Sequence, residues 1–362
     1  MDKKAATKQF FRTTLLDWFQ QSERPLPWKD TKDPYLIWLS EIILQQTRVE
    51  QGMPYYKKFV EKYPSIQDLA RAEEDEVLKL WEGLGYYSRA RNLHYTAKYI
   101  VNDLDGIFPT THKSIRKLKG VGDYTAAAIA SFAYGQPHAV VDGNVYRVLS
   151  RFFGIETAID TTEGKKEFKK LADELLDTDN PAEYNQAIMD FGAIHCKPKR
   201  PLCPRCLHRE KCVAYKAKQV HELPKKSKKI KKRDRFFYYL IMNYKGKVQI
   251  RKRVEKDIWQ ELYEFPMIEM SHFCEWEEVT EQEWWKKNFK DQQFYISKIS
   301  KAYKQTLSHQ KIVSVFIEIK LIEGFFLEKE VNMVVDRKKI KNFAFPKIIT
   351  TYLNDKHLYL DL

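Results

Sequence analysis

Four of the five cysteines stand close enough in the sequence to bind one metal centre. Cys196, Cys203, Cys206 and Cys212 follow the pattern C-x6-C-x2-C-x5-C, whereas Cys274 stands alone. Four thiolates at this spacing suit one tetrahedral ion or one iron–sulfur cluster. A zinc ribbon usually has two C-x2-C pairs about fifteen to twenty residues apart. This segment has one such pair, so its spacing favours an iron–sulfur cluster over zinc.

Glu41 is a candidate general acid because it lies among apolar residues in the segment YLIWLSEIILQQTRV. Burial of a carboxyl group disfavours its ionised form and raises its pKa toward the range that suits a general acid. The same spacing also fits an ordinary polar helix stripe that Glu41 shares with Gln45 and Arg48. The residues alone leave both interpretations open.

Asp142 directly precedes an expected helix in the segment VVDGNVYRVLSRFFG. In this position an Asp is commonly the N-cap, which accepts hydrogen bonds from the first turn of the helix. A carboxylate beside a helix N-terminus also stays ionised, so it can face a positive charge that develops in a transition state. Asp142 is therefore a candidate for either role.

A short turn in LKGVGDYTAAAIASFAYG could bind a phosphate group. Gly120 and Gly122 allow a tight turn, and the Ala-rich stretch from Tyr124 to Tyr134 predicts a helix that stops at Gly135. The free N–H groups at the start of such a helix can hold a DNA phosphate. An ordinary corner between two helices has the same pattern.

A second glycine-containing loop occurs in WEGLGYYSRARNLH. Gly83 and Gly85 loosen a loop that carries Tyr86 and Tyr87 ahead of two arginines. Aromatic side chains next to arginines suit stacking on bases and pairing with phosphates. Two tyrosines before a helix also serve as ordinary packing residues.

The elements that must position these residues change character along the chain. From residue 7 to about 215 the apolar periodicity is helical. Residues 215–235 hold ten Lys or Arg against two acidic residues, without apolar periodicity, which is typical of a solvated linker. After Arg235 the period changes to two, which indicates strands, and we expect the first hairpin to turn at Lys245-Gly246.

The sequence therefore predicts a multidomain fold. An all-α domain covers residues 1–215, a basic linker covers residues 216–235, and an α+β domain covers residues 236–362. A length of 362 residues agrees with more than one hydrophobic core.

Composition and charge restrict the partners. The formal charge of +14 and the pI near 9.2 favour a polyanion such as nucleic acid. No apolar run approaches the roughly 20 residues of a membrane-spanning helix, and the N-terminus lacks the apolar core of a signal peptide. We therefore expect a cytoplasmic protein without a membrane partner.

Two of these motifs resemble one superfamily. The cysteine spacing is similar to that of the endonuclease III superfamily of DNA glycosylases, and L-x-G-V-G followed by an Ala-rich helix resembles its helix-hairpin-helix. The resemblance implies one 4Fe-4S cluster on the four cysteines and a DNA-binding role for Gly120 and Gly122. It also implies that Asp142, at the superfamily's VDxN position, stabilises a cationic sugar.

The string LSEIILQQT closely resembles MutY-type adenine glycosylases, in which the residue corresponding to Glu41 protonates the adenine. By this resemblance Tyr86 inserts beside the orphaned base, Gln46 fills the vacated space, and Thr47 and Leu84 contact 8-oxoguanine. An adenine pocket is implied for two further residues, Lys29 and Gln186. Some relatives have Arg at the position of Lys29.

Lyase-type members of the superfamily carry a lysine where this chain has Tyr124. The difference implies a monofunctional glycosylase that uses water, with Tyr124 and Asn144 near the sugar. An acid and a stabilising anion are what hydrolysis of an N-glycosidic bond requires, and the base must first be flipped out of the duplex.

The C-terminal third resembles the MutT-like, or nudix-like, domain of MutY-type enzymes. Residues 236–362 lack the nudix hydrolase sequence box, so we expect a reading role rather than pyrophosphate hydrolysis. The family's recognition hairpin usually carries Phe-Ser-His, and this chain has Leu307-Ser308-His309. The resemblance implies that Ser308 and His309 contact DNA, with Ser308 hydrogen-bonding 8-oxoguanine.

The expected protein is thus a bacterial, nucleoid-associated and monomeric adenine DNA glycosylase. Its expected partner is double-stranded DNA with adenine opposite 8-oxoguanine or guanine. Two alternatives stay open, an endonuclease III-like glycosylase-lyase and a non-catalytic DNA-binding scaffold. Tyr124 and the C-terminal domain oppose the first, and the pair of Glu41 and Asp142 opposes the second.

Overall fold

The computed structural model describes residues 3–22, 24–227, 231–327 and 332–355. The chain forms two compact units. The first combines Met1–Arg71 with Asn92–Lys229, and the second combines Ala72–Arg91 with Ile230–Leu362. The segment Ala72–Arg91 lies within the range predicted for the helical domain, yet it packs as part of the second unit.

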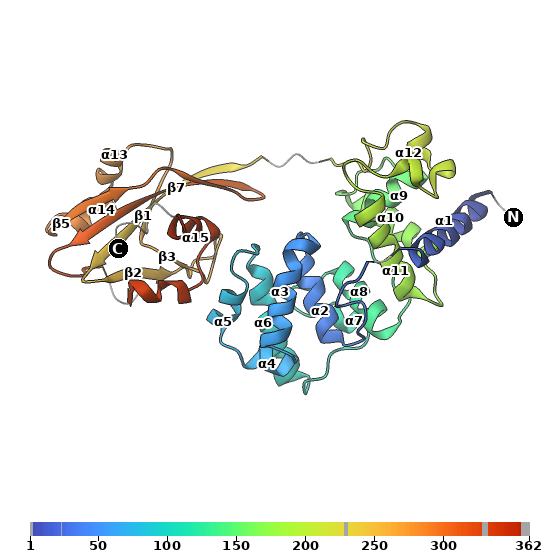
Figure 1. The fold of residues 1–362 in the computed structure, drawn as a ribbon, viewed down its shortest axis with the longest axis horizontal. Coiled ribbons are helices and arrows are strands. Elements are labelled where there is room, and N and C mark those ends of the chain that lie inside the picture. The colour runs from blue at the N-terminus through green and yellow to red at the C-terminus, as the bar shows by residue number, and fades with distance from the viewer. Residues whose placement is uncertain (1–2, 23, 228–230, 328–331, 356–362) are drawn as a thin grey trace. The chain divides into compact units, whose positions relative to one another are not determined.

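The first unit is helical throughout its described residues (Figure 1). Its longer helices are α1 (Lys3–Gln20), α2 (Pro34–Leu44), α3 (Val49–Lys62), α4 (Ile66–Arg71), α6 (Ser88–Asp103, which begins in the second unit), α8 (Asp123–Tyr134), α9 (Gly143–Phe153), α10 (Thr162–Leu175) and α11 (Pro181–Asp190). Shorter pieces are α7 (His112–Ile115), the π-helix η1 (Phe191–His195), the 3-10 turns η2 (Cys203–Arg205) and η3 (Arg209–Lys211), and α12 (Val213–Lys216).

Local signals in the sequence set several helix ends. Asp33 caps α2 by accepting a hydrogen bond from the Tyr35 N–H, and Pro34 occupies the first turn, where its missing N–H costs nothing. Helix α8 stops at Gly135, which is in the left-handed conformation. The predicted helix from Tyr124 to Tyr134 is therefore confirmed.

The core of the first unit gathers the apolar faces of α1, α8, α9, α10 and α11. Fully buried members include Phe11, Leu149, Phe168 and Leu175.

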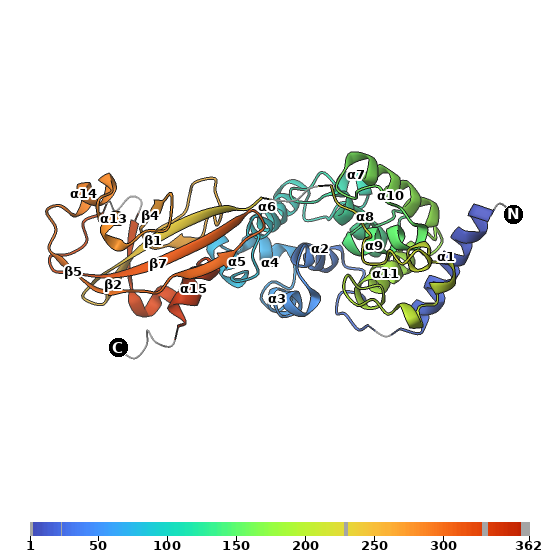
Figure 2. The same ribbon diagram turned by 90° about the horizontal axis from the view of Figure 1, so that it is seen from above.

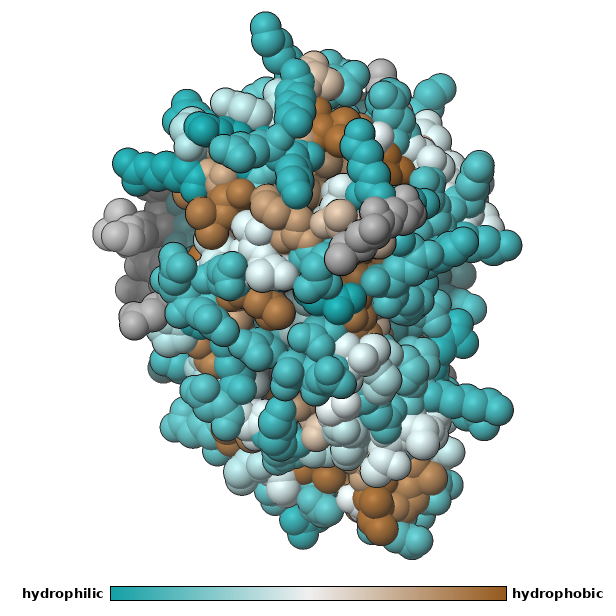
Figure 3. Space-filling view, turned by 90° about the vertical axis from the view of Figure 1, so that its right-hand side faces the viewer, coloured by the Kyte–Doolittle hydropathy of each residue, from teal (hydrophilic) through white to brown (hydrophobic). Residues whose placement is uncertain are grey.

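Figure 3 shows hydrophilic residues over most of the face in view, with hydrophobic residues only in small scattered groups. No helix among the described residues is long and apolar enough to cross a membrane.

The first half of the predicted linker packs on the helical unit, whereas the sequence predicted a solvated segment. Val220 and Leu223 are buried against Ala214, and the Ser227 N–H donates to Asp160 Oδ1 at 2.8 Å. Residues 217–227 therefore pack on the helical unit instead of forming a solvated linker. Two apolar side chains suffice to anchor this lysine-rich stretch, although they are too few to produce a periodic pattern.

The second unit is α+β, and its strands form one mixed sheet among the described residues. The strands are β1 (Arg233–Tyr244), β2 (Lys247–Lys252), β3 (Tyr263–Glu264), β4 (Met267–Met270), β5 (Phe294–Ile299), β6 (Tyr303–Thr306), β7 (Gln310–Leu321) and β8 (Asn332–Asp336). The main path runs β3-β2-β1-β7-β5, while β4 pairs with β1, β6 with β7 and β8 with β2. Among the strands that the structure describes, only β1 and β7 pair in parallel, and Figures 1 and 2 show these two long strands side by side.

The expected first hairpin is confirmed. Tyr244 pairs with Lys247, so Lys245 and Gly246 form a two-residue turn, and both have positive φ, 47° and 74°. This is the geometry of a type I′ turn, whose twist matches that of the flanking strands.

Helices cover both faces of the sheet. Helices α13 (Trp276–Thr280) and α14 (Glu283–Phe289) bury Val279, Trp285 and Phe289 against one face. Helix α15 (Lys347–Leu353) follows the 3-10 helix η4 (Arg337–Asn342) and stacks Tyr352 on Phe316 of the other face.

Helix α5 (Glu74–Leu80) belongs to the second unit through polar contacts. Asp75 accepts hydrogen bonds from Lys252 Nζ at 2.8 Å and from the Tyr263 hydroxyl at 2.6 Å. Glu82 Oε1 accepts from the Phe345 N–H at 2.8 Å. The loop that follows α5 is thus held by the C-terminal sheet domain.

Candidate active site

Glu41 lies on α2 and is buried, as its apolar neighbours predict. Burial raises the pKa of Glu41 to about 7, while a hydrogen bond from the Tyr124 hydroxyl lowers it and the charge of Asp142 raises it. The Tyr124 hydroxyl also lies 3.3 Å from Met189 Sδ. A carboxyl group with this pKa is partly protonated near neutral pH, which is what a general acid requires.

Asp142 is the N-cap of α9. Its Oδ1 accepts hydrogen bonds from the Asn144 N–H at 2.9 Å and the Val145 N–H at 2.8 Å, and its Oδ2 accepts from Asn144 Nδ2 at 2.7 Å. Burial raises the pKa of Asp142, and these three donors together with Arg147 act in the opposite direction. The capping role is therefore present, and the same hydrogen bonds orient the carboxylate.

Arg147 connects this carboxylate site to the cysteine loop. Its Nη2 donates to Asn144 Oδ1 at 2.9 Å and to the Gly192 carbonyl at 2.6 Å, and its Nε donates to the Cys196 carbonyl at 2.8 Å. Gly192 is required here because a Cβ atom on it would lie 2.6 Å from Asn144 Cβ. Sequence reasoning missed Arg147, although its place one helical turn after Gly143 put it near the site.

The two expected adenine-pocket residues meet on a third residue that sequence reasoning missed. Lys29 Nζ lies 2.6 Å from Asp190 Oδ2, and Gln186 Nε2 donates to Asp190 Oδ1 at 3.1 Å. Arg24 Nη1 also contacts Asp190 Oδ1, at 2.5 Å. Asp190 carries the signal used for Glu41, a carboxylate within an apolar helical stretch, and it lies four residues after Gln186.

The helix-hairpin-helix turn has the expected form. Gly120 has a φ of 80°, and a Cβ atom on it would lie 2.8 Å from Asn92 Cβ, so only glycine fits without a shift. Gly122 precedes α8, whose first turn has no side-chain cap. The N–H groups of that turn are thus placed to meet an anion such as phosphate.

Gln46 and Thr47 follow the end of α2. Gln46 is exposed and has a φ of 54°, a left-handed conformation that is uncommon for a residue with a side chain. The Thr47 N–H donates to the Leu44 carbonyl at 3.0 Å. Both residues therefore lie in a tight turn directly after the helix that carries Glu41.

The four clustered cysteines line one cavity, which Arg151, His208 and several apolar side chains also line. No three or more His, Cys, Asp or Glu side chains in the described part of the chain are arranged to hold a single metal ion. Four thiols that line one cavity are a ligand set that could hold an iron–sulfur cluster.

The charge of Arg151 and the protonation of the cysteine thiols are compatible with a bound iron–sulfur cluster. Arg151 Nη1 lies 3.4 Å from Cys196 Sγ, where its positive charge can offset that of thiolates. Burial raises the pKa of Cys206 to about 12 and also raises the pKa of Cys203 and of Cys212. Thiols in this state are neutral until a metal displaces their protons.

Two of the expected DNA-contacting residues meet within the second unit. The Tyr86 hydroxyl lies 2.5 Å from Ser308 Oγ. Tyr86 is 45% exposed and has a φ of 50°, and Ser308 and His309 form the tip of the β6–β7 hairpin. Leu84 is buried, so a contact between its side chain and DNA would require the loop to rearrange.

Arg89 holds the loop that presents Tyr86. Its guanidinium lies over the rings of Trp81, at 5.0 Å, and Tyr86, at 5.6 Å, and its Nη2 donates to the Gly85 carbonyl at 3.2 Å. Burial lowers the pKa of Arg89 to about 10, so the side chain still carries its charge at neutral pH. The exposed ring of Tyr86 thus rests on a charged and buried support.

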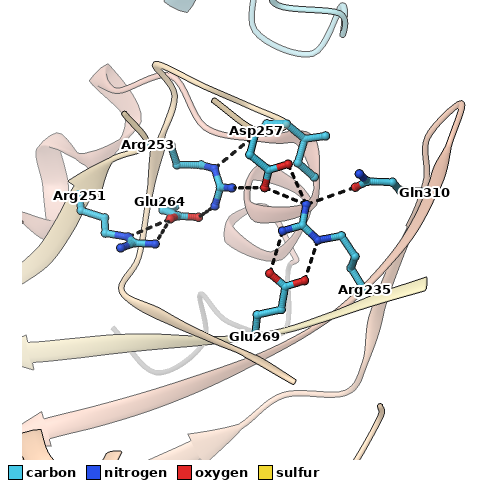
Figure 4. Close-up of polar contacts among 8 residues, drawn as sticks. Arg235, Arg251, Arg253, Asp257, Glu264, Glu269 and Gln310 are labelled. Atoms are coloured by element: carbon cyan, nitrogen blue, oxygen red, sulfur yellow. Dashed lines mark hydrogen bonds and ion pairs between the residues drawn. The ribbon is translucent and has the colours of Figure 1, made fainter. Parts of the chain in front are cut away.

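An ionic network contacts Gln310, the residue that follows the hairpin tip (Figure 4). Arg235 Nη1 lies 2.8 Å from Asp257 Oδ2, its Nε lies 2.7 Å from Glu269 Oε1, and Nη1 also donates to Gln310 Oε1 at 3.4 Å. Its remaining members are Arg251, Arg253 and Glu264. Gln310 is the first residue of β7, so the network fixes the strand that follows Ser308 and His309.

Comparison with known proteins agrees with this arrangement. Residues 39–174 match the model of the HhH-GPD superfamily of base excision DNA repair proteins, and residues 237–355 match the NUDIX domain. Over 346 residues the chain is 33% identical to the adenine DNA glycosylase of Buchnera aphidicola subsp. Schizaphis graminum, an alignment that covers 95% of this chain and 97% of that protein. The chain belongs to the adenine DNA glycosylase family. It is therefore a DNA glycosylase of base excision repair.

Other members of the adenine DNA glycosylase family match a shorter part of the chain at higher identity. The mouse protein is 43% identical over 222 residues, which cover 59% of this chain and 43% of the mouse protein. Among solved structures, a thermostable thymine-DNA glycosylase matches 60% of this chain and 100% of its own length, with a TM-score of 0.56 and 33% identity. Endonuclease III in a non-covalent DNA complex matches 58% of this chain and 97% of its own length, with a TM-score of 0.51 and 24% identity, which concerns the fold alone.

Proposed function

We propose that this glycosylase hydrolyses the N-glycosidic bond of adenine that lies opposite 8-oxoguanine or guanine in double-stranded DNA. The observation that carries the proposal is the buried Glu41, which has a pKa of about 7 and lies near the Asp142 carboxylate that caps α9. Glu41 protonates the departing adenine, and Asp142 stabilises the positive charge that develops on the sugar. The adenine must first leave the base stack, because its bond to the sugar is inaccessible within the duplex.

Water completes the reaction in this proposal. Tyr124 takes the place at which lyase-type relatives carry a lysine, and a phenol hydroxyl cannot form a Schiff base with the sugar. The hydrogen bond between Tyr124 and Glu41 keeps the acid oriented. The proposed enzyme is thus a monofunctional glycosylase.

Base release from matched duplexes tests this function. The panel contains adenine opposite 8-oxoguanine, guanine or thymine, together with an oxidised pyrimidine opposite adenine. We expect release of adenine from the first two duplexes and no trapped adduct with borohydride. Release of the oxidised pyrimidine, or a robust borohydride adduct, would show that the chain is instead a glycosylase-lyase.

We further propose that the β6–β7 hairpin reads 8-oxoguanine. A serine hydroxyl has one donor and two acceptor positions, so Ser308 can hydrogen-bond the lesion while it contacts Tyr86. The exposed ring of Tyr86 offers a surface for stacking beside the estranged base. Gln46, Thr47 and His309 complete the proposed set of DNA contacts.

Ser308→Ala should reduce the preference for 8-oxoguanine over guanine. Loss of one hydrogen bond corresponds to about a threefold to tenfold change in the ratio of the two adenine-release rates. Thr306→Ala is the matched control, because it removes an exposed hydroxyl from the same hairpin. A ratio that Ser308→Ala leaves at the wild-type value would refute the reading role of this serine.

The third proposal is that Cys196, Cys203, Cys206 and Cys212 hold one 4Fe-4S cluster. When bound, the cluster supplies four iron–thiolate bonds that crosslink the loop. Hydrolysis of the N-glycosidic bond involves no electron transfer, so we assign the cluster a structural role in holding the loop. Lys199, Arg205 and Arg209 are exposed on the loop and give it the positive charge that suits DNA phosphates.

Cys206→Ser should abolish the cluster. We expect the purified variant to lose the yellow-brown colour, and its iron content to fall from about four atoms per chain to below one. Cys274→Ser is the matched control, because it makes the same substitution at a cysteine of the second unit, away from the four clustered cysteines. Zinc without iron in the wild-type protein would contradict the proposal.

A further inference from the structure

The loop that carries Tyr86 is attached to the sheet domain on both sides of this residue. Earlier in the chain, Asp75 and Glu82 accept hydrogen bonds from groups of the C-terminal part of the chain. Later in the chain, Arg91 Nη1 donates to the Gln260 carbonyl at 2.7 Å, and Arg91 Nη2 donates to Gln260 Oε1 at 3.4 Å. All of these residues belong to the second unit. The loop is thus held to one rigid body at both of its ends.

Arg91 is also bonded to the loop itself. Its backbone N–H donates to the Tyr87 carbonyl at 3.1 Å, in the first turn of α6. The Tyr87 hydroxyl in turn accepts from the Gly83 N–H at 3.0 Å. Tyr86 stands between these bonds and contacts Ser308 through its hydroxyl. A shift of Arg91 would therefore be passed to the residue that meets the β6–β7 hairpin.

The turn that receives Arg91 has an unusual backbone. Trp259 and Glu261 flank Gln260 and have φ angles of 61° and 66°, a region that costs free energy for any residue with a side chain. The Leu262 N–H donates to the Trp259 carbonyl at 3.0 Å, and the Glu261 N–H donates to the Arg253 carbonyl at 2.7 Å. Arg253 is itself fixed in the ionic network of Figure 4. Such strain persists only where the surrounding structure imposes it, and here it leaves the Gln260 carbonyl facing Arg91.

The sequence pattern alone would also allow Arg91 to contact a DNA phosphate. In the structure Arg91 is half-buried, and both terminal nitrogens of its guanidinium donate to Gln260. Burial lowers the pKa of Arg91, whereas the nearby carboxylates of Glu261 and Glu74 act in the opposite direction. Two negative charges at this place repel a phosphate. The surroundings of Arg91 therefore favour a contact within the protein over a contact with DNA.

We propose that Arg91 is a positioning residue that holds the Tyr86 loop to Gln260 and thereby sets the preference for adenine opposite 8-oxoguanine over adenine opposite guanine. The inference rests on the proposed reading of 8-oxoguanine by the β6–β7 hairpin and deepens it. A loop attached on both sides keeps Tyr86 and Ser308 in contact before DNA binds. Preorganisation of this kind lowers the entropic cost of forming the contacts that are specific to the lesion.

The ratio of adenine-release rates opposite 8-oxoguanine and opposite guanine tests the proposal. Single-turnover rate constants are used, because with enzyme in excess they do not depend on the active fraction of a variant. Arg91→Met keeps the apolar stem and removes the donors, and we expect the ratio to fall by about threefold to tenfold. Arg91→Lys keeps a donor and should restore most of the preference. The double variant with Ser308→Ala should fall by less than the product of the single effects, since Arg91 acts through the contact of Tyr86 with Ser308.

Two measurements separate this role from a phosphate contact. Gln260→Lys sets a like charge against Arg91, so the preference should fall although the variant adds positive charge. The affinity for an undamaged duplex is also measured at several KCl concentrations, and Arg91→Met should leave the slope of log Kd against log [KCl] unchanged. Arg205→Met is the comparison, because this exposed arginine of the cysteine loop should change the slope by about 0.9, the effect of one phosphate contact.

Hydrogen exchange of the loop amides provides a readout that does not need activity. Exchange in residues 83–89 should be faster in Arg91→Met and in Gln260→Lys. Lys290→Met is the matched control, because it removes an exposed positive charge elsewhere in the second unit and should change neither the ratio nor the exchange.

Three results for Arg91→Met would overturn the inference: a wild-type ratio, wild-type exchange of the loop, or a salt slope that changes by one phosphate contact. A wild-type enzyme without any preference for 8-oxoguanine would instead refute the proposed reading role. Exchange of the loop in Arg91→Met would still test the attachment in that case, so the two failures are distinguishable.

Discussion

Replacement of Glu41 by Gln should lower the single-turnover rate of adenine release by about 10²- to 10⁴-fold, the usual contribution of a positioned general acid. Glutamine has the shape of the neutral carboxyl group but no proton that it can give to the base. The rate is measured on an adenine:8-oxoguanine duplex with enzyme in excess. A rate within a few-fold of the wild type would remove Glu41 from the proposed mechanism.

The pH dependence of the same rate gives an independent test. Burial raises the pKa of Glu41 to about 7, so the acid is protonated below this pH and ionised above it. The wild-type rate should therefore fall as the pH rises through about 7, because only the protonated form can act as acid. The residual rate of Glu41→Gln should lack this alkaline limb.

Glu41→Gln should also stabilise the protein at alkaline pH. Burial raises the pKa of Glu41 from its ordinary value of 4.5 to about 7, so the stability of the wild type that depends on this group is complete below pH 4.5 and is lost as the pH rises from there through about 7. A shift of this size corresponds to at most about 3 kcal/mol at high pH. Denaturant unfolding at pH 4 and pH 9 should show a gain in the free energy of unfolding only at the higher pH.

Replacement of Asp142 by Asn should lower the rate by about 10²- to 10³-fold, the cost of removing one electrostatic stabiliser from a transition state. Asparagine is as good an N-cap as aspartate, so helix α9 should keep its stability. Single-turnover kinetics and thermal unfolding together separate charge from capping. A large loss of thermal stability with a proportional loss of activity would indicate that Asp142 acts only as a cap.

The decrease in rate on the acid side of the pH profile is expected to depend on Asp142. Burial raises the pKa of Asp142, although the donors from Asn144, Val145 and Arg147 oppose this shift. Asp142 stabilises a cation only when ionised, so the wild-type rate should fall as the pH drops through its raised pKa. Together with the alkaline limb from Glu41, a bell-shaped profile is expected.

Local patterns in the sequence were sufficient for the elements that carry the site. The polar residue within an apolar helical stretch predicted Glu41 on a helix, and the Asp before an apolar helix predicted the cap of α9. The two-residue turn at Lys245-Gly246 was predicted from its residue types alone. Helix periodicity, caps and tight turns are properties of neighbouring residues, which explains why they can be read without the fold.

The linker shows where such local reasoning fails. Charge and the absence of periodicity indicated a solvated segment, yet Val220 and Leu223 are buried in the helical unit. Whether two isolated apolar side chains become buried depends on whether a complementary surface lies within reach, and composition does not contain that information. The transfer of Ala72–Arg91 to the second unit has the same cause, since the partners of Asp75 lie far along the chain.

By itself the sequence determined the motifs of this protein: the four cysteines, the hairpin glycines, one carboxylate within an apolar helical stretch and one directly before a helix. Tertiary structure alone decided which distant groups meet. It placed Tyr124 against Glu41, Arg147 between Asn144 and the carbonyl of Cys196, and the buried Asp190 between Lys29 and Gln186. Each set joins segments that are distant in the sequence, such as α2 with Glu41 and α8 with Tyr124, and the packing of these segments, which follows from side-chain shape over the whole core, sets the distances.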